Sequence, residues 1–210
     1  MSDDRLGRLE SIAGPVSRET FESLLAFEER FRRWSASINL VAPSTLAELW
    51  KRHILDSAQL MRLAPATMRW LDLGSGGGFP GAIVAILLKD RPGSSISLVE
   101  SNRKKAAFLQ TSLSLLAAPA RVFPMRIEDA PDAVEQPEIV TARALASLND
   151  LMQLSLPWIE RGARAFFHKG RDYRREVEES RVTWMFDLIE HPSAVDDDSI
   201  VLEIANLRRR

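Results

Sequence analysis

Hydrophobic positions in the first 65 residues recur with a helical period. From Ser17, a residue type that caps helices, apolar side chains follow three or four positions apart up to residue 38. A second segment opens with Thr45 and Glu48 at the spacing of a capping box and carries another apolar stripe as far as Pro65. The pattern therefore predicts a helical cap over residues 1–65.

From residue 68 the pattern changes to short apolar strands that alternate with helices. The strands are expected at 68–73, 96–99, 121–123, 138–142 and 163–168, and the helices at 80–88, 103–117, 147–157 and 171–181. Strands joined by helices favour right-handed crossovers and a parallel sheet. The segments 183–189 and 200–207 flank three aspartates and predict an antiparallel strand pair. We expect one α/β domain over 1–210, in which 66–210 form a mostly parallel sheet with helices on both faces.

The strongest local signal is a glycine-rich loop after the first predicted strand. Five of the ten glycines lie between Gly74 and Gly81, more than a tight turn needs. The loop contains a formal G-x-G-x-x-G match, a weak pattern by itself that allows a dinucleotide site. Asp72 argues against that interpretation, because a carboxylate at the strand end would repel a pyrophosphate and favour an ammonium or sulfonium centre.

The spacing of Asp72, Gly74, Gly76 and Gly78 resembles the first motif of class I S-adenosylmethionine-dependent methyltransferases, and this resemblance implies that all four residues bind the cofactor. By that resemblance, Glu100 at the end of the second strand is placed to accept hydrogen bonds from the two ribose hydroxyls of the cofactor. Because ligands of such sheets bind outside the carboxyl ends of the strands, the loop and Glu100 are expected at one edge.

Further segments narrow the resemblance to one family. They are Trp34–Leu40, Arg52–Ser57, Gly76–Gly81, Arg143–Asp150 and Lys169–Gly170. In this order they resemble the bacterial rRNA small subunit methyltransferase G family, also called glucose-inhibited division protein B. The resemblance implies an enzyme that transfers a methyl group from S-adenosylmethionine to N7 of a guanine in 16S ribosomal RNA of the small ribosomal subunit.

The same resemblance implies roles for individual residues. Gly74 and Phe79 would line the cofactor site, Ile127 and Glu128 would lie around the adenine, and Arg143 would be the arginine of the cofactor site. Guanine N7 carries a free lone pair, so methyl transfer needs two reactants held in position more than it needs a base. We expect Arg143 near the methionine end or the incoming base, and we expect Asp72 to orient the cofactor. Arg143→Ala is expected to reduce methylation sharply while leaving the fold intact.

Composition limits the remaining possibilities. Cysteine is absent, which excludes thiolate metal sites and thiol nucleophiles, and no metal site is expected. The longest apolar run, 82–88, is too short to span a bilayer, and the polar opening residues do not predict a secretory signal, so a soluble cytoplasmic protein is expected. The net charge is −1, from 28 basic and 29 acidic residues. RNA attraction is therefore expected to be local, at basic clusters such as 103–105 and 169–175, with the acidic residues 196–198 elsewhere. A monomer is the default expectation.

Some interpretations stay open. His53, with Asp56 one turn later, is more typical of a packed core histidine than of a ligand or base, although the family resemblance brings both toward the mouth of the active site. Two other functions also fit parts of the pattern. One is a nucleotide-dependent oxidoreductase, and the other is a ribosome-assembly factor that binds RNA and has lost its activity.

Overall fold

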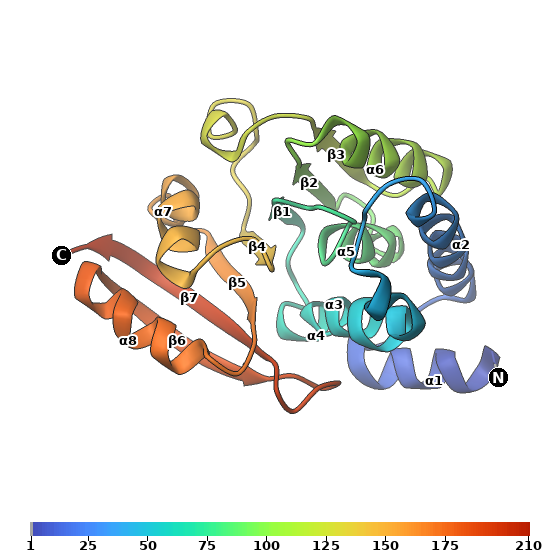
Figure 1. Ribbon diagram of the computed structural model, residues 1–210, viewed down its shortest axis with the longest axis horizontal. Coiled ribbons are helices and arrows are strands. Elements are labelled where there is room, and N and C mark those ends of the chain that lie inside the picture. Colours follow the sequence, from blue (N-terminus) through green and yellow to red (C-terminus); the bar gives the residue numbers. More distant parts are fainter. Residues whose placement is uncertain (1) are drawn as a thin grey trace.

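The computed structural model describes residues 2–210, and its centre is one sheet of seven strands (Figure 1). The strand order is β3-β2-β1-β4-β5-β7-β6. The strands are β1 (Arg69–Leu73), β2 (Ser95–Val99), β3 (Ala120–Phe123), β4 (Ile139–Arg143), β5 (Arg164–Lys169), β6 (Trp184–Pro192) and β7 (Ile200–Arg209). The first five are parallel, whereas β7 runs antiparallel to both β5 and β6. The predicted mostly parallel sheet with an antiparallel C-terminal pair is confirmed.

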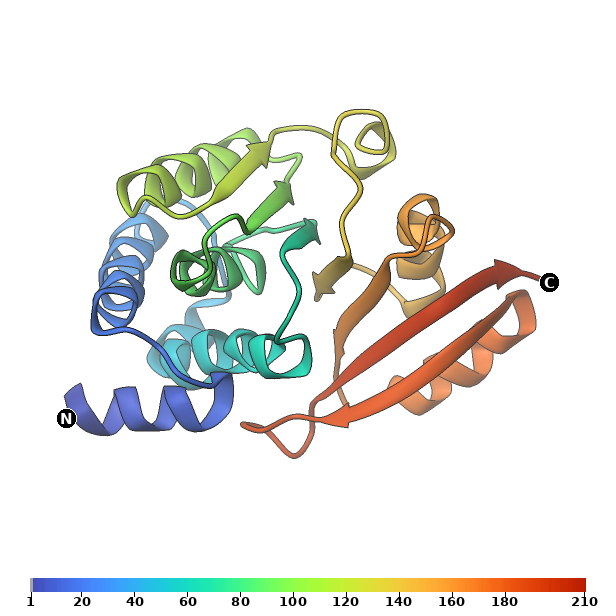
Figure 2. The same cartoon turned by 180° about the vertical axis from the view of Figure 1, so that it is seen from behind.

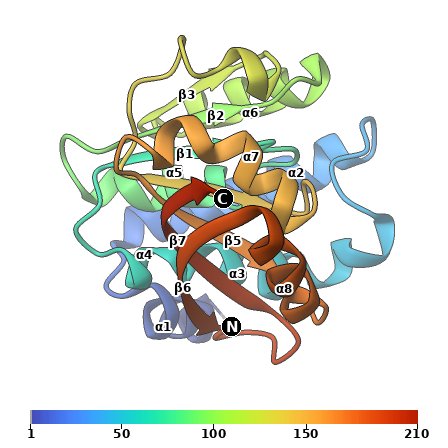
Figure 3. The ribbon, with the colours of Figure 1, turned by 90° about the vertical axis from the view of Figure 1, so that its left-hand side faces the viewer.

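Helices cover both faces of this sheet. They are α1 (Ser2–Ala13), α2 (Arg18–Ser35), α3 (Asp56–Ala58), α4 (Leu60–Leu63), α5 (Gly81–Leu87), α6 (Arg103–Leu115), α7 (Leu148–Ile159) and α8 (Tyr173–Thr183). Short 3-10 helices lie at η1 (Pro43–Glu48), η3 (Leu88–Asp90) and η4 (Ile127–Asp129), and a π-helix at η2 (Trp50–Leu55). The first six α-helices gather on one face, and α7 and α8 lie on the other (Figures 1 and 2). Figure 3 shows the molecule from the β6–β7 edge, with α8 beside that strand pair.

The cap begins as the sequence predicts but continues differently. Ser17 caps α2, and its side chain accepts a hydrogen bond from the backbone N–H of Thr20. The predicted capping box at Thr45 is wrong: η1 already begins at Pro43, and the Thr45 hydroxyl donates to the carbonyl of Ala42. The predicted single helix is instead a series of short 3-10, π and α segments that ends at Leu63.

Helix α1 and the end of α7 also differ from the expectations. The sequence pattern did not single out α1, although Leu9 and Ile12 lie three positions apart and are both buried. Pro157 does not end α7, which continues to Ile159. Trp158 and Ile159 are buried in the core, and this packing keeps the last turn helical although Pro157 lacks a backbone donor.

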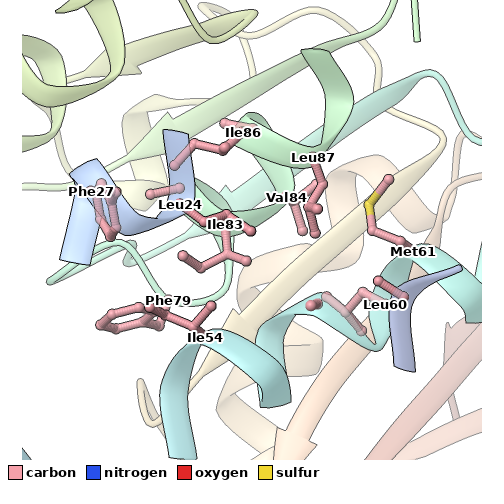
Figure 4. Packing of buried hydrophobic residues seen from close by; sticks show 14 of the residues in the cluster. Leu24, Phe27, Ile54, Leu60, Met61, Phe79, Ile83, Val84, Ile86 and Leu87 are labelled. Carbon is pink, nitrogen blue, oxygen red and sulfur yellow. The ribbon is translucent and has the colours of Figure 1, made fainter. Parts of the chain in front are cut away.

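The cap and the sheet share one hydrophobic core. Every residue of α5 is buried, so this short helix is packed on all sides. Figure 4 shows side chains of α2, of the segment 54–61 and of α5 packed together: Leu24, Phe27, Ile54, Leu60, Met61, Ile83, Val84, Ile86 and Leu87, with Phe79 beside Ile54. This packing fixes the η2–α3 segment next to the glycine loop, at the edge where β1 and β4 end.

Candidate functional site

Two cavities lie at the carboxyl ends of the parallel strands. The first cavity has a volume of about 610 Å³ and is lined by 74–77, 99–101, 125–128 and 143–146, together with other residues that include Phe79. The second cavity, of about 550 Å³, is lined by parts of 45–56, 143–146, 168–170 and 195–199. Thr45, His53, Arg143, Ala144 and Ala146 line both. The cavities are therefore neighbours that share a wall.

Most of the predicted site residues meet at the first cavity. Gly74, Gly76, Phe79, Glu100, Ile127, Glu128 and Arg143 all line it. Asp72 and Gly78 do not, although both belong to the motif in the sequence. The structure thus divides the motif into residues that face the cavity and residues that hold the loop in place.

Asp72 is fully buried, and its carboxylate accepts hydrogen bonds from other residues of the protein. One carboxylate oxygen accepts the backbone N–H of Gly81 at 3.2 Å, and the other accepts the Thr141 hydroxyl at 2.9 Å. The carboxylate therefore lies at the N-terminus of α5, where a helix favours negative charge. Burial is the main cause that raises the pKa of Asp72 to about 6. Asp72 does not line the first cavity, so this geometry does not support the expectation that its carboxylate itself binds and orients the cofactor.

Asp72→Asn is expected to stabilise the protein at pH 8 and to have less effect at pH 4.5. With a pKa of about 6 in the folded state against 3.8 ordinarily, ionised Asp72 costs up to about 3 kcal/mol; this cost decreases as the pH falls from 6 and is gone below 3.8, so about 1 kcal/mol remains at pH 4.5. The amide can still accept from Gly81 and can donate to Thr141. Thermal unfolding at the two pH values tests this, and an Asp72→Asn protein less stable than wild type at pH 8 would contradict it.

Asp90 gives a control of opposite sign. Burial by itself would raise the pKa of Asp90, but hydrogen bonds from Ser17 and Thr20 outweigh it and lower the pKa. A carboxyl with a lowered folded-state pKa stabilises the fold at high pH and loses that contribution on acidification. Asp90→Asn is therefore expected to lose more stability at pH 8 than at low pH.

Gly78 faces the core instead of the first cavity. It has φ +100°, and a Cβ built there would lie 2.7 Å from the Cβ of Ala82 and 2.9 Å from Leu109. The backbone conformation and the close approach of α5 and α6 both require glycine at this position. A Cβ at Gly76 would meet only a backbone oxygen, 3.7 Å away. The spacing of the motif does not show this difference between Gly76 and Gly78.

Glu100 holds the glycine loop from the end of β2. One of its oxygens accepts the backbone N–H of Gly76 and the other accepts that of Asn102, both at 2.7 Å. A carboxylate oxygen has two acceptor positions, so each can accept one further hydrogen bond. Glu100 can therefore fix the loop and still bind hydroxyl groups in the cavity.

Arg143 extends from the end of β4 into the wall between the two cavities. Its guanidinium donates to the Asp56 carboxylate at 3.1 Å and to the carbonyl of Arg52 at 3.2 Å, and it also contacts Nδ1 of His53. Burial and the charge of Arg143 lower the pKa of His53 to about 4, so this imidazole is neutral at pH 7. The His53 ring stacks on Phe79 with centroids 5.0 Å apart. The shared wall thus has a positive charge on one side chain only.

Part of the second cavity was not predicted from the sequence. His53 and Asp56 are buried, as the core interpretation expects, yet both line this cavity, as do His168, Asp196 and Asp198. The expectation that the acidic residues 196–198 lie elsewhere is therefore wrong. Lys169 is also not a free basic side chain, because it is only 8% exposed at the side chain and pairs with Glu176 at 2.7 Å. The residues that line the second cavity lie far apart along the chain, so no local sequence pattern predicts that they come together.

Two absences concern the described part of the chain alone. Between residues 2 and 210, no helix is long and apolar enough to cross a membrane. Over the same range, no group of three or more His, Asp and Glu side chains is arranged to hold a metal ion.

The strand order and the glycine loop together define a Rossmann-like methyltransferase fold. Among solved structures, TrmN from Thermus thermophilus has a TM-score of 0.55 at 15% identity and covers 87% of this chain and 53% of that one. The ribosomal protein L11 methylase from Lactobacillus delbrueckii subsp. bulgaricus has a TM-score of 0.53 at 16% identity and covers 71% of this chain and 77% of its own. At these identities the likeness concerns the fold.

The family follows from closer relatives. The family model described as rRNA small subunit methyltransferase G matches residues 20–198. A protein of Chelativorans sp. named ribosomal RNA small subunit methyltransferase G is 62% identical over 209 residues and covers 100% of both chains. A protein of the same name from Brucella canis is 58% identical and covers 100% of this chain and 98% of its own. The chain belongs to the rRNA small subunit methyltransferase G family, as its sequence motifs predict.

Proposed function

We propose that this protein transfers a methyl group from S-adenosylmethionine to N7 of a guanine in 16S ribosomal RNA of the small ribosomal subunit. The observation that carries the proposal is the pair of neighbouring cavities that share Arg143 and His53 in one wall. Methyl transfer needs a donor and an acceptor side by side, and two adjoining cavities provide that arrangement. The family name supports the choice of RNA as the acceptor.

The first cavity fits S-adenosylmethionine. Its volume lies within the range of about 300–1,000 Å³ that is typical of small-molecule sites. Gly74 and Gly76 leave the loop without side chains that would fill the cavity, and Glu100 keeps free acceptor positions for ribose hydroxyls. Val99, Met125 and Ile127 provide an apolar surface for an adenine, with Glu128 beside them. When bound, the cofactor supplies an electrophilic methyl group on a sulfonium centre.

The residues of the shared wall are suited to positioning. Guanine N7 carries a lone pair and no proton, so no residue has to remove a proton before the attack. His53 is neutral at pH 7 and adds no charge beside a positively charged donor. Arg143 is held by Asp56 and can orient the cofactor or the base in the second cavity. We assign Arg143 as the catalytic residue of this proposal.

The same geometry disfavours the dinucleotide-dependent oxidoreductase. In a dinucleotide fold, the pyrophosphate binds at the N-terminus of the helix that follows the glycine loop. Here the Asp72 carboxylate bonds to the N–H of Gly81 at the start of α5. A pyrophosphate at that place would meet a carboxylate. Calorimetric titration distinguishes the two functions: S-adenosylhomocysteine should bind and NAD should not.

Arg103 and Lys104 are our candidates for RNA phosphate contacts. Both are exposed at the start of α6, directly after the end of β2, and their neighbour Lys105 lines the first cavity. Replacing both with glutamate should weaken binding to small-subunit particles. It should also reduce the slope of log K against log salt by about 0.7–0.9 for each phosphate that the protein no longer neutralises. Filter binding over a range of salt concentrations measures this slope.

A matched control reverses two charges on the cap. Arg8 and Arg18 are exposed, and neither lines a cavity. Arg8→Glu with Arg18→Glu changes the net charge by the same amount and should leave the salt slope near that of wild type. An equal reduction of the slope in both double variants would show that net charge, and not a local contact, governs RNA binding.

The proposed function is tested by mapping N7-methylguanine in 16S rRNA from cells with and without the gene for this protein. One N7-methylguanine should disappear in the deletion and return when purified protein and S-adenosylmethionine are added to the isolated small subunits. An identical modification pattern in both strains would overturn the proposal. RNA binding without methyl transfer would favour the inactive assembly factor instead. We infer that the enzyme acts in the cytoplasm as a monomer, and light scattering at working concentration tests the oligomeric state.

A further inference from the structure

Asp56 is the centre of a buried hydrogen-bond network between the two cavities. One of its carboxylate oxygens accepts from Arg143 at 3.1 Å. The other accepts from the amide of Gln59 at 2.8 Å and from the hydroxyl of Ser193 at 3.3 Å. The Asp56 residue is 7% exposed. A single carboxylate thus joins the cap, the end of β4 and the turn between β6 and β7.

Gln59 extends the network into that turn. Its carbonyl oxygen accepts the backbone N–H of Ala194 at 3.1 Å, while its amide nitrogen donates to Asp56. The following residues of the turn, Val195, Asp196, Asp198 and Ser199, line the second cavity. The position of this part of the cavity wall is therefore set by the same carboxylate that holds Arg143.

The guanidinium of Arg143 has little freedom within this arrangement. It donates to the carbonyl of Arg52 at 3.2 Å and contacts His53 in addition to Asp56. It also lies 5.8 Å from the centre of the Phe79 ring. Of these partners, Asp56 alone is negatively charged, so it provides the strongest of the contacts that hold the guanidinium.

We propose that Asp56 is the positioning residue for Arg143, and that through Gln59 and Ser193 it couples the β6–β7 turn to the orientation of that guanidinium. The inference rests on the proposed methyl transfer. Asp56 also lines the second cavity, but its carboxylate pairs with the Arg143 guanidinium, so we assign its effect to the orientation of that guanidinium. A substrate that moves the turn on entering the second cavity therefore also acts on Arg143.

A double-mutant cycle in methyl-transfer kinetics tests the first part of the proposal. Asp56→Asn keeps the size of the side chain and removes its charge. It should lower kcat for small subunits by about tenfold to 100-fold, because a small displacement of a positioned group has effects of this size. The affinity for S-adenosylhomocysteine should change by less than about threefold, because the glycine loop and Glu100 are untouched. In an Arg143→Gln background, Asp56→Asn should have no further effect on kcat.

Ser193→Ala tests the coupling to the turn and does not depend on the folding of Asp56→Asn. Ser193 is half-buried in a surface turn, so this variant should fold with a nearly unchanged melting temperature. It should lower kcat/KM for small subunits by about threefold to tenfold in the wild-type background. In the Arg143→Gln background it should have no effect.

The matched control is Asp90→Asn, which also replaces a carboxylate that ties the cap to the sheet domain. Asp90 lines neither cavity, so kcat should stay at the wild-type value. If Asp56→Asn or Ser193→Ala lowered the methylation rate equally in the wild-type and Arg143→Gln backgrounds, the proposed coupling would be wrong. A wild-type protein that methylates no small subunits would instead overturn the proposed function, so the two failures are distinguishable.

Discussion

Arg143→Gln is expected to lower kcat for methylation of small ribosomal subunits by about 100-fold. Arg143 belongs to the wall shared by both cavities, and its guanidinium is fixed by Asp56 and by the carbonyl of Arg52. Glutamine keeps a hydrogen-bonding group at this position but removes the charge and part of the length. Single-turnover assays with saturating S-adenosylmethionine measure the effect, and calorimetry with S-adenosylhomocysteine measures the change in cofactor binding separately.

The ion pair between Arg143 and Asp56 changes what Arg143→Ala should do. Their side chains are 16% and 10% exposed, and removing one partner of a buried pair costs about 3–5 kcal/mol. Arg143→Ala should therefore lower the melting temperature as well as the activity, contrary to the expectation of an intact fold. Arg143→Gln combined with Asp56→Asn removes both charges and separates the two effects. Turnover near the wild-type rate in that folded double variant would refute the role of Arg143.

Gly78→Ala is expected to destabilise the protein by about 3 kcal/mol. The positive φ of 100° contributes about 1–2 kcal/mol, and the overlap of the new methyl group with Ala82 and Leu109 contributes about 1–3 kcal/mol. Ala82 belongs to a fully buried helix, so its Cβ cannot move away. Urea unfolding measures the change in the free energy of unfolding.

Gly76 in the same loop and Gly7 in α1 provide controls for Gly78. Gly76→Ala should cost only about 1–2 kcal/mol from its φ of 54°, because a Cβ there has a single neighbour at 3.7 Å, and it should weaken cofactor binding. Gly7→Ala lies in an exposed part of α1 with nothing within 4 Å and should stabilise the protein by about 0.5–1 kcal/mol. If Gly78→Ala were as mild as Gly76→Ala, the packing interpretation would be wrong.

The sequence predicts the sheet and the glycine loop well because both depend on signals between near neighbours. Each of β1 to β5 overlaps its predicted segment closely, and the loop residues Gly74 and Gly76 line the first cavity. Spacing cannot tell which side of the loop a residue faces, so it assigns Asp72 and Gly78 to the ligand although they face the protein. The direction of a side chain depends on the packing of α5 and α6 around it.

The second cavity is hidden from the sequence for a different reason. Asp56 and Ser193 are 137 positions apart, and no local pattern indicates that they share a hydrogen bond. Asp196 and Asp198 resemble a solvated acidic turn, yet the antiparallel pairing of β7 with β5 brings that turn to the carboxyl end of β5, where both residues line the second cavity. These contacts form only when β6 and β7 take their places in the sheet, and local sequence patterns do not predict that placement.

The placement of β7 between β5 and β6 also sets the order in which the site can form during synthesis. The glycine loop, Glu100 and Arg143 can come together once β4 is in the sheet, but the wall made by the turn at 193–199 requires β7 to pair with β5. All residues that line the first cavity precede residue 155, whereas the second cavity also uses 168–170 and 195–199, which are synthesised later. The second cavity therefore depends on the strand that is made last, and the first cavity does not.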